Sequence, residues 1–183
     1  MKEPSKSYNN MSDIIDRIYT NNSDLIKYLD DAKEPSYRIE AELNFKKGLL
    51  LSIASLFENK ITILLTNFIT KKTNSNDLVI SFFNNKAIKR QYHTLFSWDS
   101  ANANSFFGLF GNNFKNKMKE RVRTEEKLDR AIKSFLELGN LRNQLVHKNF
   151  AEFSIDKTAK EIYDKFYEAK YFISELRSEL ENG

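Results

Sequence analysis

Apolar residues recur at intervals of three and four positions along most of this chain, a pattern typical of helices that bury one face. The longest such stretch runs over residues 35–72, starts at a proline and has Gly48 as its only glycine. It predicts the central helix of the fold. The side chains expected to be buried in it are Ile39, Leu43, Leu50, Ile53, Phe57, Ile61, Leu64, Leu65 and Phe68.

Three further helices are predicted from the same periodicity and from cap residues. The first follows a flexible tail at residues 1–10 and runs from Ser12, as N-cap, to about residue 31. The second opens at Thr124, where two acidic residues complement the helix dipole, and ends near residues 147–149. The third begins near residues 154–156. Their expected buried side chains are Ile14, Ile15, Ile18, Leu25, Ile26 and Leu29, then Leu128, Ile132, Phe135, Leu136, Leu138, Leu141 and Leu145, then Ile162, Phe166, Ala169, Phe172, Ile173, Leu176 and Leu180.

The middle of the chain is less regular. Residues 73–77 have loop and cap chemistry, and residues 78–90 predict a shorter helix. Residues 91–114 hold the single tryptophan, Trp98, and two of the five glycines, so short helical turns are expected there, without an evident role for residues 98–111. The whole pattern predicts an all-α fold, a bundle of four to five main helices with a short irregular insertion.

Composition narrows the classes of function. A chain of 183 residues suits a single domain, expected over residues 11–183. The absence of cysteine excludes disulfides, thiolate metal sites and cysteine nucleophiles, and two histidines make a metal site improbable, so neither a metal nor another cofactor is predicted. No apolar run is judged long enough to cross a membrane, and no signal peptide is recognised, which favours a cytoplasmic protein without a membrane partner.

A basic stretch offers one candidate contact with nucleic acid. The net charge is +4, which permits an anionic partner. The cations at residues 115–123 occur at every second position, and on a helix this spacing spreads charge over both flanks, as on an ordinary solvated surface. The alternative is a nonspecific track for an RNA backbone. The residues predicted for RNA binding are Lys115, Lys119, Arg123 and Lys148.

The segment of residues 142–147 carries the candidate chemistry. Arg142 precedes His147 by five positions, near the end of a predicted helix. The guanidinium of an arginine grips a phosphate, and an imidazole moves a proton near neutral pH. In metal-free RNA cleavage, a base removes the proton of a ribose 2′-hydroxyl, which attacks the adjacent phosphorus, while a cation balances the developing charge and an acid protonates the leaving oxygen. Because one histidine cannot easily make both transfers together, a second copy of the motif, and hence a homodimer, is expected.

Geometry alone leaves a plainer interpretation open. An ideal helix separates Arg142 and His147 by about 140° around its axis and roughly 7.5 Å along it. Asn143 lies one turn before His147, where its amide could orient the imidazole or touch substrate. The alternative is a surface arginine and a helix-terminal histidine that complements the negative helix end.

Residues 138–147 resemble the signature of the HEPN superfamily, in which an arginine, usually followed by a polar residue, precedes a histidine at the end of a late helix. Residues 38–42, 48–58 and 102–111 are similar to the bacterial branch typified by RiboL-PSP and MAE-type HEPN proteins. The resemblance covers most of residues 12–180.

This resemblance implies a bundle of four to five helices that dimerises, with metal-independent endoribonuclease activity and frequent service as a toxin or antiphage effector. It implies that Arg142 and His147 are catalytic and that Asn143 takes the polar position. RNA, a second copy of the chain and an antitoxin or regulatory protein are the expected partners. The alternatives are a noncatalytic HEPN module that binds nucleotide, nucleic acid or protein, and a helical adaptor without a role in RNA chemistry.

Overall fold

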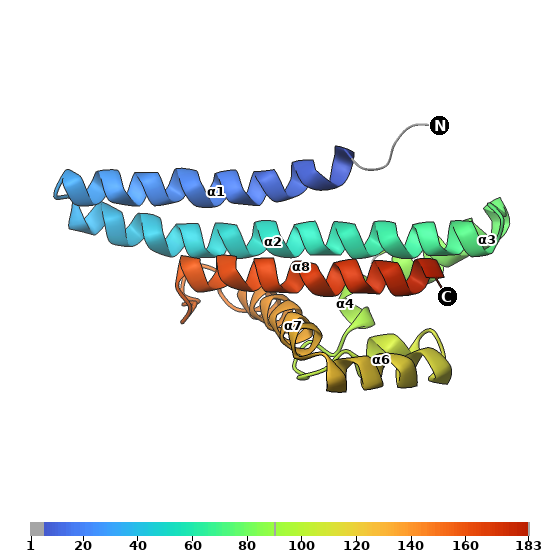
Figure 1. The fold of residues 1–183 in the computed structure, drawn as a ribbon. Coiled ribbons are helices and arrows are strands. Elements are labelled where there is room, and N and C mark those ends of the chain that lie inside the picture. Colours follow the sequence, from blue (N-terminus) through green and yellow to red (C-terminus); the bar gives the residue numbers. More distant parts are fainter. Residues whose placement is uncertain (1–5, 90, 183) are drawn as a thin grey trace. The chain divides into compact units, whose positions relative to one another are not determined.

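Helices make up the regular structure of this protein in the computed structural model, which describes residues 6–89 and 91–182. Within these ranges there are eight α-helices, one π-helical segment and no strand (Figure 1). This confirms the predicted all-α fold. The five long helices are α1 (Lys6–Asp31), α2 (Pro35–Lys72), α6 (Asn112–Thr124), α7 (Glu126–His147) and α8 (Ala159–Asn182). The short elements are α3 (Asp77–Phe83), η1 (Asn84–Ile88), α4 (Tyr92–Leu95) and α5 (Asn104–Gly108).

The chain divides into two compact units. The first comprises residues 1–56 and 141–164, and the second comprises residues 57–140 and 165–183. Helices α2, α7 and α8 each contribute one part to each unit. The prediction of one domain over residues 11–183 therefore stays a prediction.

The first unit is built on α1 and the N-terminal part of α2, which lie side by side and run in opposite directions (Figure 1). The Arg38 guanidinium of α2 forms an ion pair with Asp30 of α1, at 3.1 Å. Tyr19 of α1 stacks on Tyr163 of α8, with 4.0 Å between ring centroids. The Tyr163 hydroxyl donates a hydrogen bond to Asp16 at 2.9 Å. These contacts hold α1 against α2 near Asp30 and against α8 near Asp16 and Tyr19.

The second unit has an aromatic core. Phe57 of α2 contacts Phe135 of α7 and Phe166 of α8, with centroids 5.4 and 5.6 Å apart. Phe172 of α8 meets Phe135 edge to face at 5.2 Å. These four rings are almost fully buried, which favours a core role for Phe166 and Phe172 over base stacking. The apolar positions expected to be buried in α7 and α8 are buried, except for Leu141, which is half-buried.

Trp98 packs directly on a glycine of α7. A Cβ added to Gly139 would overlap the Cε3 and Cζ3 atoms of the indole, so only glycine allows this approach. The indole Nε1 donates a hydrogen bond to the backbone oxygen of His93 at 2.8 Å. Phe96 and Phe135 flank the ring, with centroids 5.1 and 5.8 Å away. This part of the irregular insertion therefore anchors α7.

The apolar faces of α1 and of early α2 are less buried than predicted. Ile14 and Leu25 of α1 are exposed by 43% and 45%, and Ile39 and Leu43 of α2 by 55% and 41%. Of the six positions expected to be buried in α1, only Ile15 is fully buried. Periodicity identifies an apolar face but does not say whether another element of the same chain covers it.

Three predicted helix starts need correction. Helix α1 begins at Lys6, so residues 6–10 are helical, because no proline or glycine interrupts the stretch before Ser12; residues 1–5 lie outside the described part. Thr124 ends α6, and its hydroxyl donates back to the Glu120 carbonyl at 3.0 Å, so α7 begins at residue 126. Helix α8 begins at residue 159, because Thr158 and Glu161 form a capping box.

The expectation that no stretch of the chain could cross a membrane also needs correction, for α2. By length and composition alone this helix could cross a membrane, contrary to the expectation that no stretch of this chain is long enough. More than half of its most apolar window is buried inside the structure. A buried core helix passes the same test, so length and composition do not distinguish the two kinds of helix.

Candidate functional site

The last turns of α7 carry the predicted catalytic residues. Arg142 and Asn143 are half-buried, and His147, the final residue of α7, is exposed. Leu145 between them is fully buried and fixes this end of the helix in the first unit. The Arg142 Nη1 atom donates a hydrogen bond to Asn143 Oδ1 at 3.2 Å.

Helical geometry orders the three side chains around α7. Asn143 and His147 are four residues apart and therefore share one face, while Arg142 lies about 100° to one side of Asn143. Among the described residues, no hydrogen bond or ion pair joins His147 to either of the others. The structure thus brings Arg142 and Asn143 together. It leaves the His147 imidazole exposed to solvent on the face of α7 that His147 shares with Asn143. This arrangement offers a cation, an amide and a titratable ring to one anionic ligand.

Two neighbouring lysines of α2 hold the loop that follows His147. The buried Lys47 donates from Nζ to the backbone oxygens of Phe150, at 2.6 Å, and Ala151, at 3.3 Å. Lys46 donates to the backbone oxygen of Ile155 at 3.0 Å. The ammonium groups thereby satisfy carbonyls that no helix or strand engages. The loop at residues 148–158 is held against the first part of α2, within the first unit.

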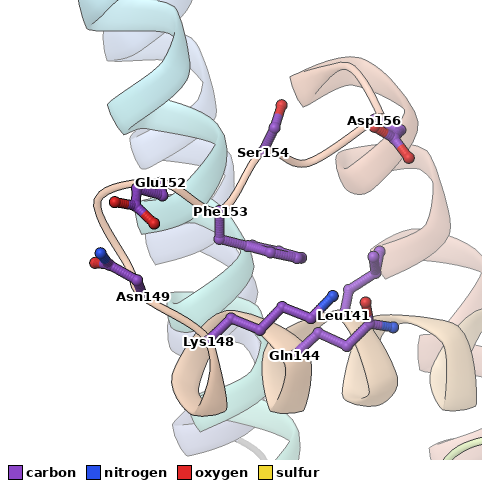
Figure 2. A pocket seen from close by; sticks show the side chains of 8 residues that line it. All are labelled: Leu141, Gln144, Lys148, Asn149, Glu152, Phe153, Ser154 and Asp156. Carbon is purple, nitrogen blue, oxygen red and sulfur yellow. The ribbon is translucent and has the colours of Figure 1, made fainter.

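A pocket of about 430 Å³ lies between this loop and α7. Figure 2 shows the side chains of Lys148 and Phe153 extending toward Leu141 and Gln144 of α7, with Asp156 across the space from Lys148. The Lys148 ammonium lies 5.2 Å from the centre of the Phe153 ring. Asn149, Glu152 and Ser154 complete the lining. Arg142, Asn143 and His147 do not line this pocket.

The pocket was not predicted from the sequence, except for Lys148. Phe153 and Asp156 are separated from the Arg142 motif by a segment without helical periodicity, so no pattern associates them with it. Their position depends on the contacts that Lys46 and Lys47 make over more than one hundred residues of chain. The lysine pair itself carried no signal, because adjacent lysines usually face solvent.

The other predicted RNA-binding residues belong to the second unit. Lys119 is exposed and Lys115 half-buried, and neither has an ion pair among the described residues. Arg123 forms an ion pair with Glu120 at 2.5 Å. Arg121, in the same basic stretch, contacts three carboxylates, those of Glu125, Glu175 and Glu179, at 2.8, 2.7 and 2.9 Å. Its guanidinium lowers the pKa of Glu125.

These ion pairs reduce the charge that the basic stretch offers to a phosphate backbone. Only Lys115 and Lys119 of the predicted contacts there are without a carboxylate partner in the described ranges. An RNA-binding role for Lys115, Lys119 and Arg123 stays a prediction.

Two other ionisable residues, His93 and Glu42, make structural contacts. His93 is exposed and supplies only its backbone oxygen, to Trp98. Glu42 forms an ion pair with Arg38 at 3.3 Å. Among the described residues, no group of three or more His, Cys, Asp or Glu side chains is placed to hold a metal ion.

A larger pocket of about 1000 Å³ lies in the second unit. Its lining is mainly apolar, and none of the predicted catalytic or RNA-binding residues takes part in it. Phe106, Leu109 and Phe110 of the irregular insertion contribute to it. The insertion thus forms part of a cavity wall as well as the Trp98 anchor.

The comparisons with known proteins identify a family. No curated protein and no solved structure matches this chain. The model of the family described as RiboL-PSP-HEPN matches residues 16–182, which include most of both units and the Arg142 to His147 segment. Since this match covers most of the sequence, the chain belongs to the RiboL-PSP-HEPN family.

Proposed function

We propose that this protein is a metal-independent endoribonuclease that acts as a homodimer, with Arg142 and His147 of both copies around one reaction centre. The observation that carries the proposal is the end of α7, where Arg142 contacts Asn143 beside an exposed His147. Family membership supports it, because HEPN domains are commonly ribonucleases and often bind RNA and dimerise. We further propose a cytoplasmic toxin or antiphage effector restrained by an antitoxin or another regulatory protein.

The proposed reaction is an internal transfer at phosphorus. The neutral imidazole of one His147 takes the proton of the ribose 2′-hydroxyl, and the oxygen forms a new bond to phosphorus. The bond from phosphorus to the 5′-oxygen of the next nucleotide breaks, and the protonated His147 of the second copy gives that oxygen a proton. Both Arg142 guanidiniums stabilise the charge on the non-bridging oxygens, while Asn143 orients the Arg142 side chain. The products end in a 2′,3′-cyclic phosphate and a 5′-hydroxyl.

Exposed apolar side chains beside the candidate site support a second copy of the chain. Val146 and Phe150, which flank His147 in sequence, are exposed by 51% and 50%. Exposed apolar surface of this kind is available for another protein to cover. A two-fold axis near this end of α7 would bury both residues and bring the two histidines toward the same phosphate.

The test is cleavage of single-stranded RNA in EDTA by the wild type, by His147→Ala and by His93→Ala. The wild type and His93→Ala should cut RNA at similar rates and leave 2′,3′-cyclic phosphate ends. His147→Ala should be slower by at least about 100- to 10,000-fold, because a dimer of this variant lacks both the general base and the general acid.

His93→Ala is the matched control, since it removes the other exposed histidine of the chain. Equal activity of His147→Ala and the wild type, or products ending in a 3′-hydroxyl, would contradict the mechanism. RNA binding without cleavage by any of the three proteins would favour a noncatalytic HEPN module.

A further inference from the structure

We infer that the pocket between α7 and the loop at residues 148–158 binds a nucleobase of the RNA, and that it prefers guanine over uracil. The inference depends on the proposed function for the identity of the polymer. It adds a specificity site, formed by Phe153, Asp156, Gln144 and Lys148, that is separate from Arg142, Asn143 and His147.

The position of the pocket suits a base next to the cleaved phosphate. Gln144 and Lys148 line it from α7, and each directly follows one of the residues that face the proposed reaction centre, Asn143 and His147. Consecutive residues of a helix point about 100° apart, so the two faces adjoin around the end of α7. A strand whose phosphate lies at His147 can therefore place an adjacent base in the pocket.

The lining suits a flat heterocycle better than a phosphate. Phe153 provides an aromatic face, half-buried and with the Lys148 ammonium 5.2 Å from its centre, and single-stranded bases stack on such rings. Two carboxylates, Asp156 and Glu152, outweigh the single cation among the lining side chains. These carboxylates repel a phosphate, but their oxygens accept hydrogen bonds from a neutral base.

Unused acceptors in the pocket determine which base fits. Within the described residues, the side chains of Gln144, Ser154 and Asp156 have no hydrogen-bond or ion-pair partner. Asp156 is exposed and, when ionised, only accepts hydrogen bonds. Guanine presents two neighbouring donors, N1–H and the exocyclic amino group, that match the two oxygens of one carboxylate. Uracil offers one donor between two carbonyl oxygens, which a carboxylate repels.

Loop rigidity makes such selection possible. Lys46 and Lys47 fix the backbone on either side of Phe153, at Phe150, Ala151 and Ile155. A ring carried on a fixed backbone loses little conformational freedom when a base stacks on it, so more of the stacking energy appears as affinity.

The experiment measures binding of guanosine, adenosine, cytidine and uridine 3′-monophosphates to His147→Ala, by amide chemical shifts and calorimetry. Guanosine monophosphate should bind most tightly and uridine monophosphate most weakly, with shifts at residues 148–156. Phe153→Leu should weaken guanosine monophosphate binding about tenfold or more. Asp156→Asn should reduce the difference between the guanosine and uridine nucleotides.

Glu152→Gln is the control for Asp156→Asn, because it removes the same charge from the same loop and its side chain turns away from Phe153 (Figure 2). Equal effects of the two substitutions, equal affinity for all four nucleotides, or shifts elsewhere would overturn the inference.

Mapping of wild-type cleavage sites separates this inference from the proposed function. RNA that is cut without regard to base, in a protein whose His147→Ala variant does not distinguish the nucleotides, would end the inference and leave the ribonuclease intact. Selective nucleotide binding in a protein that never cuts RNA would contradict the proposed ribonuclease and leave the base-binding pocket intact.

Discussion

At the residue scale, α7 holds one contact that differs from the sequence-based expectation and one glycine whose role the sequence did not explain. Asn143 was expected to orient the His147 imidazole or to touch substrate, but its side-chain oxygen accepts a hydrogen bond from Arg142, its neighbour in sequence. Gly139, one turn of α7 earlier, carries no local signal. Its role depends on the Trp98 indole, which packs against it in the folded chain.

We predict opposite stability effects for two glycine-to-alanine substitutions. Gly139→Ala should destabilise the protein by about 1–3 kcal/mol or more, because the new methyl group overlaps an indole that Phe96 and Phe135 hold in place. Gly48→Ala meets nothing within 4 Å and lies inside α2, so it should stabilise by about 0.5–1 kcal/mol. Urea unfolding followed by circular dichroism measures both.

The two variants form a matched pair, since each adds one methyl group to a helix. A Gly139→Ala protein as stable as Gly48→Ala would contradict the close packing of Trp98 on α7.

At the element scale, sequence patterns located the helices but not all of their ends. Helix α2 has the predicted bounds, because Pro35 starts it and the polar loop after Lys72 ends it. The predicted starts of α1, α7 and α8 were wrong. Ser12 lies inside α1. Thr124 lies at the end of α6, where its hydroxyl donates a hydrogen bond to a carbonyl of its own helix. Thr158 and Glu161 have the sequence spacing of a capping box, and their hydrogen bonds set the start of α8.

The same limit explains which part of the candidate site was found. Arg142, Asn143 and His147 lie on one helix, so their spacing is meaningful before any fold is known. The pocket wall comes from an irregular loop whose path is set by Lys46 and Lys47 of a distant helix. No local rule connects those lysines with Phe153.

We predict that Lys47→Met loosens the loop at residues 148–158 without unfolding α7. Methionine keeps the apolar stem of the buried lysine but removes the hydrogen bonds to the Phe150 and Ala151 oxygens. Hydrogen bonds from a charged donor contribute about 1.5–3 kcal/mol each, so amide exchange in the loop should become faster by at least tenfold. Hydrogen exchange read by mass spectrometry measures this.

Lys71→Met is the control, because Lys71 also donates to a backbone oxygen, that of Glu181, but in the second unit. If both substitutions leave exchange at residues 148–158 unchanged, Lys47 does not position the loop.

At the scale of the whole molecule, the proposed account requires two copies of the chain. One copy supplies a single His147, while the proposed reaction needs a proton acceptor and a proton donor together. Family membership supports dimerisation. Val146 and Phe150 offer exposed apolar surface on either side of His147 in sequence, where α7 ends. The central claim is therefore that catalysis belongs to the pair and not to either copy.

The most direct measurement mixes wild-type protein with His147→Ala, allows the subunits to exchange, and records RNA cleavage in EDTA against the fraction of wild type. If both histidines serve one centre, only wild-type pairs are active, and an equal mixture should keep about one quarter of the activity. If each copy works alone, the same mixture would keep about one half, and activity would fall in proportion to the wild-type fraction. That linear decline would contradict the shared reaction centre.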